Sequence, residues 1–180
     1  GSYQRVALEA RPGKGKIGRG WRLFVQESSG LRIEPSAGRR GTDSGSLEVL
    51  AEDRAAQEDS RTVRWNGAAL AIFGIEGGAP IDLQRETNGE LSLAFDYRVT
   101  DAPTAEVLLS LECGVECKGS VPITLELKGA PRNEWRHLKM LLSCFQAGGA
   151  DMKKVSAPFV LGTSGQLALS ITNVRLETGK

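Results

Sequence analysis

The chain has 180 residues, 40% of them hydrophobic, which is enough to build one sizeable core and too few for two well-filled domains. Its 23 basic and 22 acidic side chains nearly cancel, so no global field draws the protein to nucleic acid or to an anionic membrane surface. No apolar run approaches the roughly 20 residues that span a bilayer, and no signal-peptide pattern opens the chain. Neither nucleic acid nor a membrane is therefore expected as a partner.

The first half of the chain carries short apolar stretches joined by long polar connections. Gly1-Ser2 is typical of the remnant that a protease leaves when an expression tag is removed, so residues 3–180 are expected to be one domain of a longer protein. The glycine-rich stretches 11–20 and 27–45 predict surface loops. Four short β-strands are expected in this half, at Trp21–Val25, Ser46–Leu50, Arg61–Trp65 and Ala69–Ile75.

The second half follows the two-residue period of a β-strand, in which successive side chains point to opposite faces of the sheet. Between Leu91 and Val99 the odd positions carry Leu, Phe, Tyr and Val, whereas the even positions include Ser92, Asp96 and Arg98. This pattern predicts a half-buried strand. Four more strands of the same kind are expected at Val107–Cys113, Val121–Leu127, Trp135–Leu142 and Gln166–Leu176.

Turn residues separate these strands, and helical periodicity is nearly absent. Asp101-Ala102-Pro103, Gly129-Ala130-Pro131 and Ser164-Gly165 are turn-prone, and stretches that could be helical, such as Glu52–Gln57, are short. Short strands of regular spacing with turns between them are typical of sandwiches. The sequence therefore predicts an all-β fold, an antiparallel β-sandwich.

Two of the three cysteines lie close together, since only three residues separate Cys113 from Cys117 where one predicted strand turns into the next. A disulfide there would close a hairpin tip, and loop entropy gives so short a ring about 2 kcal/mol of stabilisation. Two reduced thiols are the alternative. A zinc site is disfavoured, because Cys144 and His137 lack the second closely spaced pair that structural zinc sites carry.

An ordered set of short motifs in this chain resembles a known family. In chain order the motifs are Trp21-Arg22-Leu23-Phe24-Val25, Gln57-Glu58-Asp59 leading to Trp65, Ala79-Pro80-Ile81-Asp82-Leu83, Leu93-Ala94-Phe95-Asp96-Tyr97-Arg98-Val99, the Cys113 and Cys117 pair, Glu134-Trp135-Arg136, and Gly149-Ala150-Asp151 ahead of Ala157-Pro158-Phe159-Val160-Leu161. From about Trp21 to Leu176 the combination resembles the galactose-binding-like domain at the C-terminus of bacterial family three glycoside hydrolases, the exo-β-glucanase and β-glucosidase group.

The resemblance implies a jelly-roll sandwich that does no chemistry itself. The parent enzymes of this family remove glucose from the non-reducing ends of β-glucans with a catalytic domain that lies upstream. The resemblance therefore implies a carbohydrate-binding or substrate-guiding module of a secreted exo-acting β-glucosidase, periplasmic or extracellular. Its implied partners are a β-glucan or related plant polysaccharide and the upstream catalytic domain, which the loop Gln57-Glu58-Asp59 is expected to face. Two positions depart from the family: Asn173 replaces a frequent Asp, and Leu141 replaces a common Pro.

Sugar binding on a sandwich needs aromatic faces together with side chains that bind hydroxyl groups. The candidates are Trp21, Trp65 and Trp135 as aromatic platforms, and Asp96, Arg98, Glu126 and His137 as hydroxyl ligands. The alternatives are tryptophans that fill the ends of the sandwich and an exposed sheet face with cross-strand ion pairs.

The titratable residues argue against catalysis by this chain. His137 is the single histidine and lies opposite Leu138 and Met140 on its predicted strand, which suits an exposed residue or a hydrogen-bonding partner for a sugar hydroxyl. Glycoside hydrolysis needs two carboxyl groups about 5 to 10 Å apart across the substrate. Glu58 and Asp59 are adjacent and would point to opposite faces of a strand, so they make a poor acid–base pair. The chain is not expected to be an enzyme.

No cofactor is expected, although a structural calcium is conceivable in a sandwich of this resemblance. Asp43, Glu48 and Asp82 could supply carboxylates, but calcium needs six to eight oxygens that the sequence does not locate. No metal is therefore assigned. The low aromatic content of 6% favours an alternative function, a structural or interaction domain that packs on the catalytic domain or dimerises without affinity for sugar.

Overall fold

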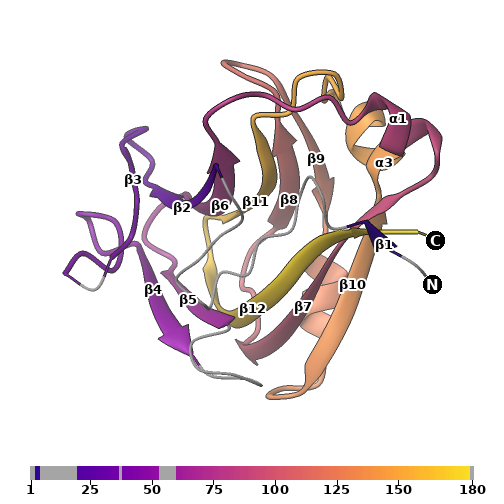
Figure 1. Cartoon of the computed structure of the whole chain (residues 1–180). Helices are drawn as coiled ribbons and strands as arrows, with labels where there is room; N and C mark the ends of the chain where they lie inside the picture. The colour runs from indigo at the N-terminus through magenta and orange to yellow at the C-terminus, as the bar shows by residue number, and fades with distance from the viewer. Residues whose placement is uncertain (1–2, 5–19, 37, 53–59, 179–180) are drawn as a thin grey trace.

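The computed structural model describes residues 3–4, 20–36, 38–52 and 60–178, most of them in β-strands (Figure 1). In chain order the elements are β1 (Tyr3–Gln4), β2 (Trp21–Gln26), β3 (Arg32–Ile33), β4 (Leu47–Glu52), β5 (Ser60–Asn66), β6 (Ala71–Gly77), α1 (Gln84–Asn88), β7 (Ser92–Asp101), β8 (Val107–Glu112), β9 (Lys118–Pro122), α2 (Thr124–Gly129), β10 (Trp135–Leu141), α3 (Leu142–Ala147), β11 (Ala157–Thr163) and β12 (Gln166–Glu177). None of the helices in these described ranges has the length and apolar character needed to cross a membrane.

The described strands form two sheets in which every pairing is antiparallel. The first sheet has the order β10-β7-β12-β5-β4, with β1 paired to the end of β12. The second sheet has the order β3-β2-β6-β11-β8-β9. Figure 1 shows α1 and α3, which contact each other, side by side at one end of the molecule. The predicted fold class, an antiparallel β-sandwich, is confirmed.

The core lies between the two sheets because each strand turns its apolar positions inward. On β7, Leu93, Phe95 and Val99 are fully buried, whereas Asp96 and Arg98 on the opposite face are only half-buried. Phe95 meets Phe159 of β11 edge to face, with the ring centroids 5.1 Å apart, so this pair joins the two sheets across the core. The alternation read from the sequence therefore assigns the inner face of β7 correctly.

One predicted strand is wrong. The segment Val121–Leu127 is not a strand: β9 ends at Pro122, and helix α2 begins at Thr124. Proline has no N–H to continue a ladder, and Ile123 and Leu127 are both fully buried while Leu125 between them is 79% exposed. Residues four apart share one face of a helix, so the buried pair follows a helical period rather than a period of two.

β11 is a strand that the periodicity analysis did not predict. Six of its seven residues are buried, including Phe159 and Leu161 in the main core. On its other face, Val160 packs with Phe24 and Ala157 in a small cluster outside the second sheet. A strand covered on both faces shows a continuous apolar run rather than alternation, and for this reason β11 lacks the period-two pattern.

The structure joins Cys113 and Cys117 in a disulfide that closes the turn between β8 and β9. The two Cα atoms are 4.9 Å apart, and the N–H of Cys113 donates to the carbonyl oxygen of Cys117 at 2.8 Å. Cys144 on α3 is a free, half-buried thiol. The disulfide therefore fixes one turn at the end of the second sheet.

Trp65 on β5 belongs to the core, which corrects its proposed role as a sugar platform. Its side chain is 2% exposed, and its Nε1–H donates to the carbonyl oxygen of Ala71 at 2.9 Å. Val63, two residues earlier on the same face of β5, is also fully buried. A ring enclosed in this way has no face left for a sugar.

We predict that Trp65→Ala lowers the free energy of unfolding by about 3 to 5 kcal/mol, the usual cost of removing a large buried aromatic ring. Trp135→Ala is the matched control and should cost no more than about 1.5 kcal/mol, because its ring is only half-buried. Urea unfolding followed by circular dichroism measures both values. If Trp65→Ala lost no more unfolding free energy than Trp135→Ala, the core position of the Trp65 ring would be contradicted.

For the disulfide, we predict that the double variant Cys113→Ser/Cys117→Ser unfolds at lower urea with a loss of about 2 kcal/mol, since the bond closes a very short ring. Cys144→Ser controls for the loss of a thiol that is not cross-linked. A loss well above 4 kcal/mol would show that this turn supports the whole fold instead of one loop.

Candidate functional site

The outer face of the first sheet collects polar side chains from three neighbouring strands, and we call this surface the polar face. It consists of Asp96 and Arg98 on β7, Trp135, His137 and Lys139 on β10, and Arg175 and Glu177 on β12. β10 and β7 are paired so that Trp135 lies opposite Arg98 and His137 lies opposite Asp96. The structure thus brings together four of the seven residues proposed from the sequence as sugar ligands.

Trp135 supplies the aromatic surface of the polar face. It is half-buried, and the guanidinium carbon of Arg98 lies 5.3 Å from its ring centroid, within the range of a cation–π contact. The contact orients both side chains at one end of the β10–β7 pair. A half-exposed indole beside an arginine provides the combination of apolar surface and hydrogen-bond donors that a pyranose ring requires.

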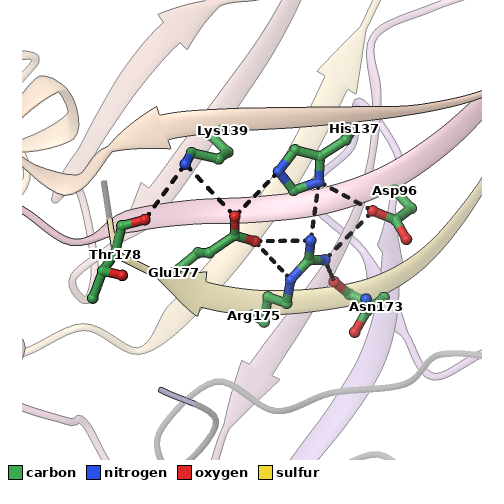
Figure 2. A network of polar contacts seen from close by, with 7 residues as sticks. All are labelled: Asp96, His137, Lys139, Asn173, Arg175, Glu177 and Thr178. Carbon is green, nitrogen blue, oxygen red and sulfur yellow. Dashed lines mark hydrogen bonds and ion pairs between the residues drawn. The ribbon is translucent and has the colours of Figure 1, made fainter. Parts of the chain in front are cut away.

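Next along the two strands, a network of ion pairs and hydrogen bonds surrounds Arg175 (Figure 2). Its Nε and Nη2 atoms lie 2.9 and 2.8 Å from Oε2 of Glu177, and Nη2 also lies 2.9 Å from Nδ1 of His137. Its Nη1 lies 3.5 Å from Oδ1 of Asp96, and that oxygen is 3.2 Å from His137 Nδ1. The guanidinium thus bridges three strands.

Lys139 completes the network at the far end. Its Nζ lies 3.6 Å from Oε1 of Glu177 and donates to the carbonyl oxygen of Thr178 at 3.4 Å. The side chains of Asp96, Arg175 and Glu177 are between 10 and 15% exposed, whereas that of His137 is 40% exposed. The imidazole is therefore the member of the network that solvent or a ligand reaches most easily.

A β-bulge on β12 turns Arg175 toward this face. Thr172 pairs with Asp96 and Arg175 with Ala94, so three steps on β12 match two steps on β7. Within the bulge, Asn173 has a φ of 56°, and its carbonyl oxygen accepts a hydrogen bond from Arg175 Nη1 at 2.6 Å. Without the extra residue, the alternation that buries Leu169 and Ile171 would direct Arg175 into the core.

Arg175 and Glu177 are therefore functional candidates that the sequence analysis missed. A signal for them was present: the large apolar residues that β12 contributes to the main core fall at 167, 169 and 171 and then at 174 and 176. The shift from odd to even positions marks the bulge, because one extra residue exchanges the two faces of a strand.

The other proposed ligands lie apart from the polar face. Trp21 packs over Gly77 on the inner side of the second sheet, where it lines the end of the core. Glu126 lies on α2, exposed, instead of on a strand. The proposed loop Gln57-Glu58-Asp59 lies outside the described residues.

The residues considered for calcium are also scattered. Asp43 lies in the turn before β4, where it binds Arg39 at 2.6 Å, and Glu48 is exposed on β4 itself. Asp82 precedes α1 and accepts a hydrogen bond from the N–H of Gln84 at 2.8 Å. Over the ranges that the structure describes, no group of three His, Cys, Asp or Glu side chains could hold a metal ion.

The outer face of the second sheet has a different character. Arg32 stacks on the ring of Phe24, with its guanidinium carbon 3.8 Å from the ring centroid, and reaches carboxylates of Glu76 and Glu112 at 2.7 and 3.2 Å. Phe24 itself is 1% exposed. Among the described residues, this face therefore presents charged side chains over a covered ring, and Phe24 offers no accessible aromatic surface.

Two hollows elsewhere on the molecule have no aromatic side chain among the described residues that line them. One lies between the edges of the sheets, lined by Leu23, Val49 and arginines at 40 and 61. The other lies beside the disulfide turn and is lined by Arg32, Glu112 and Lys118 among others. We place the candidate site on the polar face because an indole ring and several hydrogen-bonding groups meet there.

Comparison with known proteins agrees with the architecture. Residues 19–176 match the model of the family Exop_C, described as galactose-binding domain-like. No curated protein sequence matches the chain.

Among solved structures, an exo-1,3/1,4-β-glucanase (ExoP) from a Pseudoalteromonas species matches with a TM-score of 0.74 at 17% identity, covering 90% of this chain and 19% of that one. The extra C-terminal domain (X) of the same enzyme gives a TM-score of 0.67 at 17% identity, covering 90% and 88%. A family 11 carbohydrate-binding module from Clostridium thermocellum, in complex with a β-1,3-1,4-mixed-linked tetrasaccharide, gives 0.52 at 10% identity, covering 89% and 90%. At these identities the matches show a shared fold, and the chain spans 19% of the glucanase's length.

Tyr97, on the inner face of β7, carries a prediction about pH. Burial raises the pKa of its hydroxyl above the ordinary value of 10.0, while Arg136 lowers that pKa and Glu126 raises it. A raised pKa in the folded state means that the neutral hydroxyl contributes stability below about pH 10, and that this contribution is lost as the pH rises through the folded value. We predict a steeper loss of unfolding free energy above pH 10 for the wild type than for Tyr97→Phe, measured by urea unfolding between pH 9 and 11. The same dependence of unfolding free energy on pH in the wild type and in Tyr97→Phe would contradict a raised pKa of Tyr97.

Proposed function

The chain belongs to the galactose-binding domain-like family that its residues 19–176 match, and from this membership we propose that it is a non-catalytic carbohydrate-binding or substrate-guiding module of an exo-acting β-glucosidase. Its fold is that of carbohydrate-binding modules. The proposed ligand is a β-glucan or a related plant polysaccharide, bound along the polar face. The proposed partner within the same polypeptide is an upstream glycoside hydrolase catalytic domain.

The observation that carries the proposal is the position of Trp135. Of the three tryptophans, Trp65 is in the core and Trp21 packs at its end, whereas Trp135 lies on the outer face of a sheet. Beside it, within two residues along each strand, are His137 and Asp96, which can donate to and accept from hydroxyl groups. An indole surface and hydroxyl ligands therefore follow one another along the β10–β7 pair.

The same geometry supports a binding role over a catalytic one. Asp96 and Glu177 are the carboxylates of the polar face, and each lies within 3.5 Å of the Arg175 guanidinium. A general acid for glycoside hydrolysis needs a carboxyl group in surroundings that favour its protonated form. Asp96 and Glu177 instead accept hydrogen bonds from the Arg175 guanidinium, and the acceptor role suits the binding of hydroxyl groups.

Several features support the ligand class and the compartment. One structural neighbour is a domain of an exo-1,3/1,4-β-glucanase, and another is a binding module in complex with a mixed-linked tetrasaccharide. The disulfide of Cys113 and Cys117 suits an oxidising compartment, which supports the proposed periplasmic or extracellular location.

A second candidate function is an interaction module that packs on the catalytic domain or dimerises, without intrinsic affinity for sugar. The observation that favours it is Val115, 95% exposed at the tip of the disulfide turn. Leu31, at the end of the β2–β3 connection, is 46% exposed. Exposed apolar side chains on fixed turns suit a protein contact better than a sugar contact.

Affinity gel electrophoresis of this domain in mixed-linkage glucan, laminarin, xylan and a soluble cellulose derivative tests the proposal. We predict retardation by a β-glucan, and at least about tenfold weaker binding for Trp135→Ala, equivalent to a loss of about 1.4 kcal/mol of ring contact. Arg98→Ala should weaken binding, whereas Arg64→Ala, which removes an exposed arginine on the same side of the first sheet, should not. Circular dichroism confirms that each variant is folded.

The outcome that favours the second candidate is equally specific. It is the absence of retardation by all four polymers, combined with a lower thermal stability of the parent enzyme when this domain is deleted. Hydrolysis of any of these polymers by the isolated domain would overturn both proposals.

A further inference from the structure

The hollow beside the disulfide turn has a volume of about 710 Å³, within the range of about 300 to 1,000 Å³ that ligand pockets cover. The turn between β8 and β9 contributes Val115 and Glu116 to its lining, and the connection between β2 and β3 contributes Gly30. Arg32 and Glu112 line it from the second sheet. The polar face lies on the first sheet, so the hollow is a separate surface.

Arg32 is held in one orientation by contacts on one face of its guanidinium and along the edge of that group. The guanidinium carbon lies 3.8 Å from the centroid of the Phe24 ring, which covers one face. Nε and Nη2 donate to Oε1 of Gln26 at 2.9 and 2.6 Å, Nη1 donates to Oε1 of Glu76 at 2.7 Å, and Nη2 also donates to the Glu112 carboxylate at 3.2 Å. The N–H groups of a guanidinium lie in its plane, so these bonds occupy its edge.

The second face of this guanidinium is the part that a ligand can meet. The Arg32 side chain is 27% exposed and lines the hollow, although Phe24 covers one face and all three of its nitrogen atoms donate to acceptors. A sugar hydroxyl needs a free hydrogen-bonding direction, whereas the electron-rich face of an aromatic ring needs only the flat cationic face. An incoming ring would therefore complete a stack in which the guanidinium lies between two rings.

The charges of the hollow suit a neutral ring better than an ion. Its charged lining residues are Arg32 and Lys118 of one sign and Glu112 and Glu116 of the other. Glu112 is bound to Arg32, while Lys118 and Glu116 are exposed to solvent. An ionic ligand would meet both signs of charge, whereas a neutral ring gains from the cationic face alone.

Apolar side chains exposed on the two connections favour a polypeptide as the source of that ring. Val115 is 95% exposed and lines the hollow, and Leu31, which follows Gly30, is 46% exposed. The disulfide fixes the turn that carries Val115, and the N–H of Gly114 in this turn donates to Oγ of Ser156 at 3.1 Å. Aromatic side chains and arginine are enriched at the positions that dominate protein interfaces, and the apolar contacts around them exclude water.

We propose that this hollow is a docking site for a polypeptide partner, which places a tyrosine or tryptophan ring on the open face of Arg32 and neighbouring apolar side chains against Val115 and Leu31. The acceptors at the edge of the guanidinium hold it flat before the partner arrives, so little ordering is needed on binding. The inference concerns the second sheet and does not depend on sugar binding at the polar face.

Titration of the 15N-labelled domain with acetylated and amidated tripeptides, followed by NMR, tests the proposal. The peptides are Leu-Tyr-Leu, Leu-Ala-Leu, which lacks the ring, and Ser-Tyr-Ser, which lacks the apolar neighbours. We expect Leu-Tyr-Leu to shift the Nε–H signal of Arg32 and the backbone N–H signal of Val115, because the ring current of tyrosine acts on the groups around it. Leu-Ala-Leu and Ser-Tyr-Ser should each bind at least about threefold more weakly.

Variants of the domain separate the contributions of the guanidinium and of the apolar turn. Arg32→Lys keeps the charge but loses the flat group, so it should bind Leu-Tyr-Leu at least about threefold more weakly. Arg22→Lys is the matched control, because Arg22 also binds Glu76, at 3.0 Å, and is 63% exposed, and it should leave the affinity unchanged. In Val115→Ser, Leu-Tyr-Leu should lose its advantage over Ser-Tyr-Ser. Val115 is almost fully exposed, so this variant tests the site even if Arg32→Lys fails to fold.

Several results overturn the proposal. They are the absence of shifts at Arg32 and Val115 with Leu-Tyr-Leu, equal binding of Leu-Tyr-Leu and Leu-Ala-Leu, and equal affinity of Leu-Tyr-Leu for the wild type and a folded Arg32→Lys variant. Shifts of the same signals with a mixed-linkage tetrasaccharide, and with none of the peptides, would assign the hollow to a glycan and overturn the proposal as well. Concentration-dependent shifts of these signals without any peptide would overturn it in favour of a second copy of the chain.

The tetrasaccharide titration also keeps this proposal distinct from the proposed function. Sugar binding at the polar face is read from the indole Nε1–H signal of Trp135, which lies on the other sheet. Shifts at Trp135 without shifts at Arg32 support the sugar site alone, and peptide-induced shifts at Arg32 support the docking site whether or not the tetrasaccharide binds.

Discussion

The polar face depends on the extra residue that β12 carries between Thr172 and Arg175. The strand pairs with β7 along most of its length, so a shift of one residue exchanges the faces of everything that follows it. Because of the bulge, Val174 and Leu176 enter the core while Arg175 and Glu177 turn outward. A guanidinium directed into the apolar interior would be costly unless it were paired, and on the outer face it joins three strands through His137, Asp96 and Glu177.

Part of the sandwich could be predicted from sequence because a strand that is covered on one face only shows a period of two. β7 is an example, since Phe95, Tyr97 and Val99 alternate with Asp96 and Arg98 and the alternation identifies both faces. The failures have physical causes. β11 is covered on both faces and shows no alternation, and the segment from Ile123 to Leu127 mimics a strand although its buried pair has a helical spacing.

The candidate site was predictable only in part, because the type of a residue indicates its role less well than the sheet face on which the residue lies. Trp65 and Trp135 are the same residue, but Trp65 shares a strand face with buried Val63, whereas Trp135 lies opposite the face of Leu138. Alternation alone could have separated the two tryptophans. Arg175 was harder to find, because a simple period of two places it in the core, and a shift in the apolar pattern from Ile171 to Val174 is the sole local sign of the bulge.

The two outer faces of the sandwich also differ in the side chains that they present. On the second sheet, Arg32 joins Glu76 and Glu112 over the covered ring of Phe24, and this group includes no histidine. On the first sheet, the single histidine lies 40% exposed between a carboxylate and a guanidinium. The histidine thus lies on the face that carries the half-buried indole of Trp135. Its contacts with Asp96, Arg175 and Glu177 lie outside the core, so the surface that meets a ligand is built on the sandwich without being part of the packing that supports it.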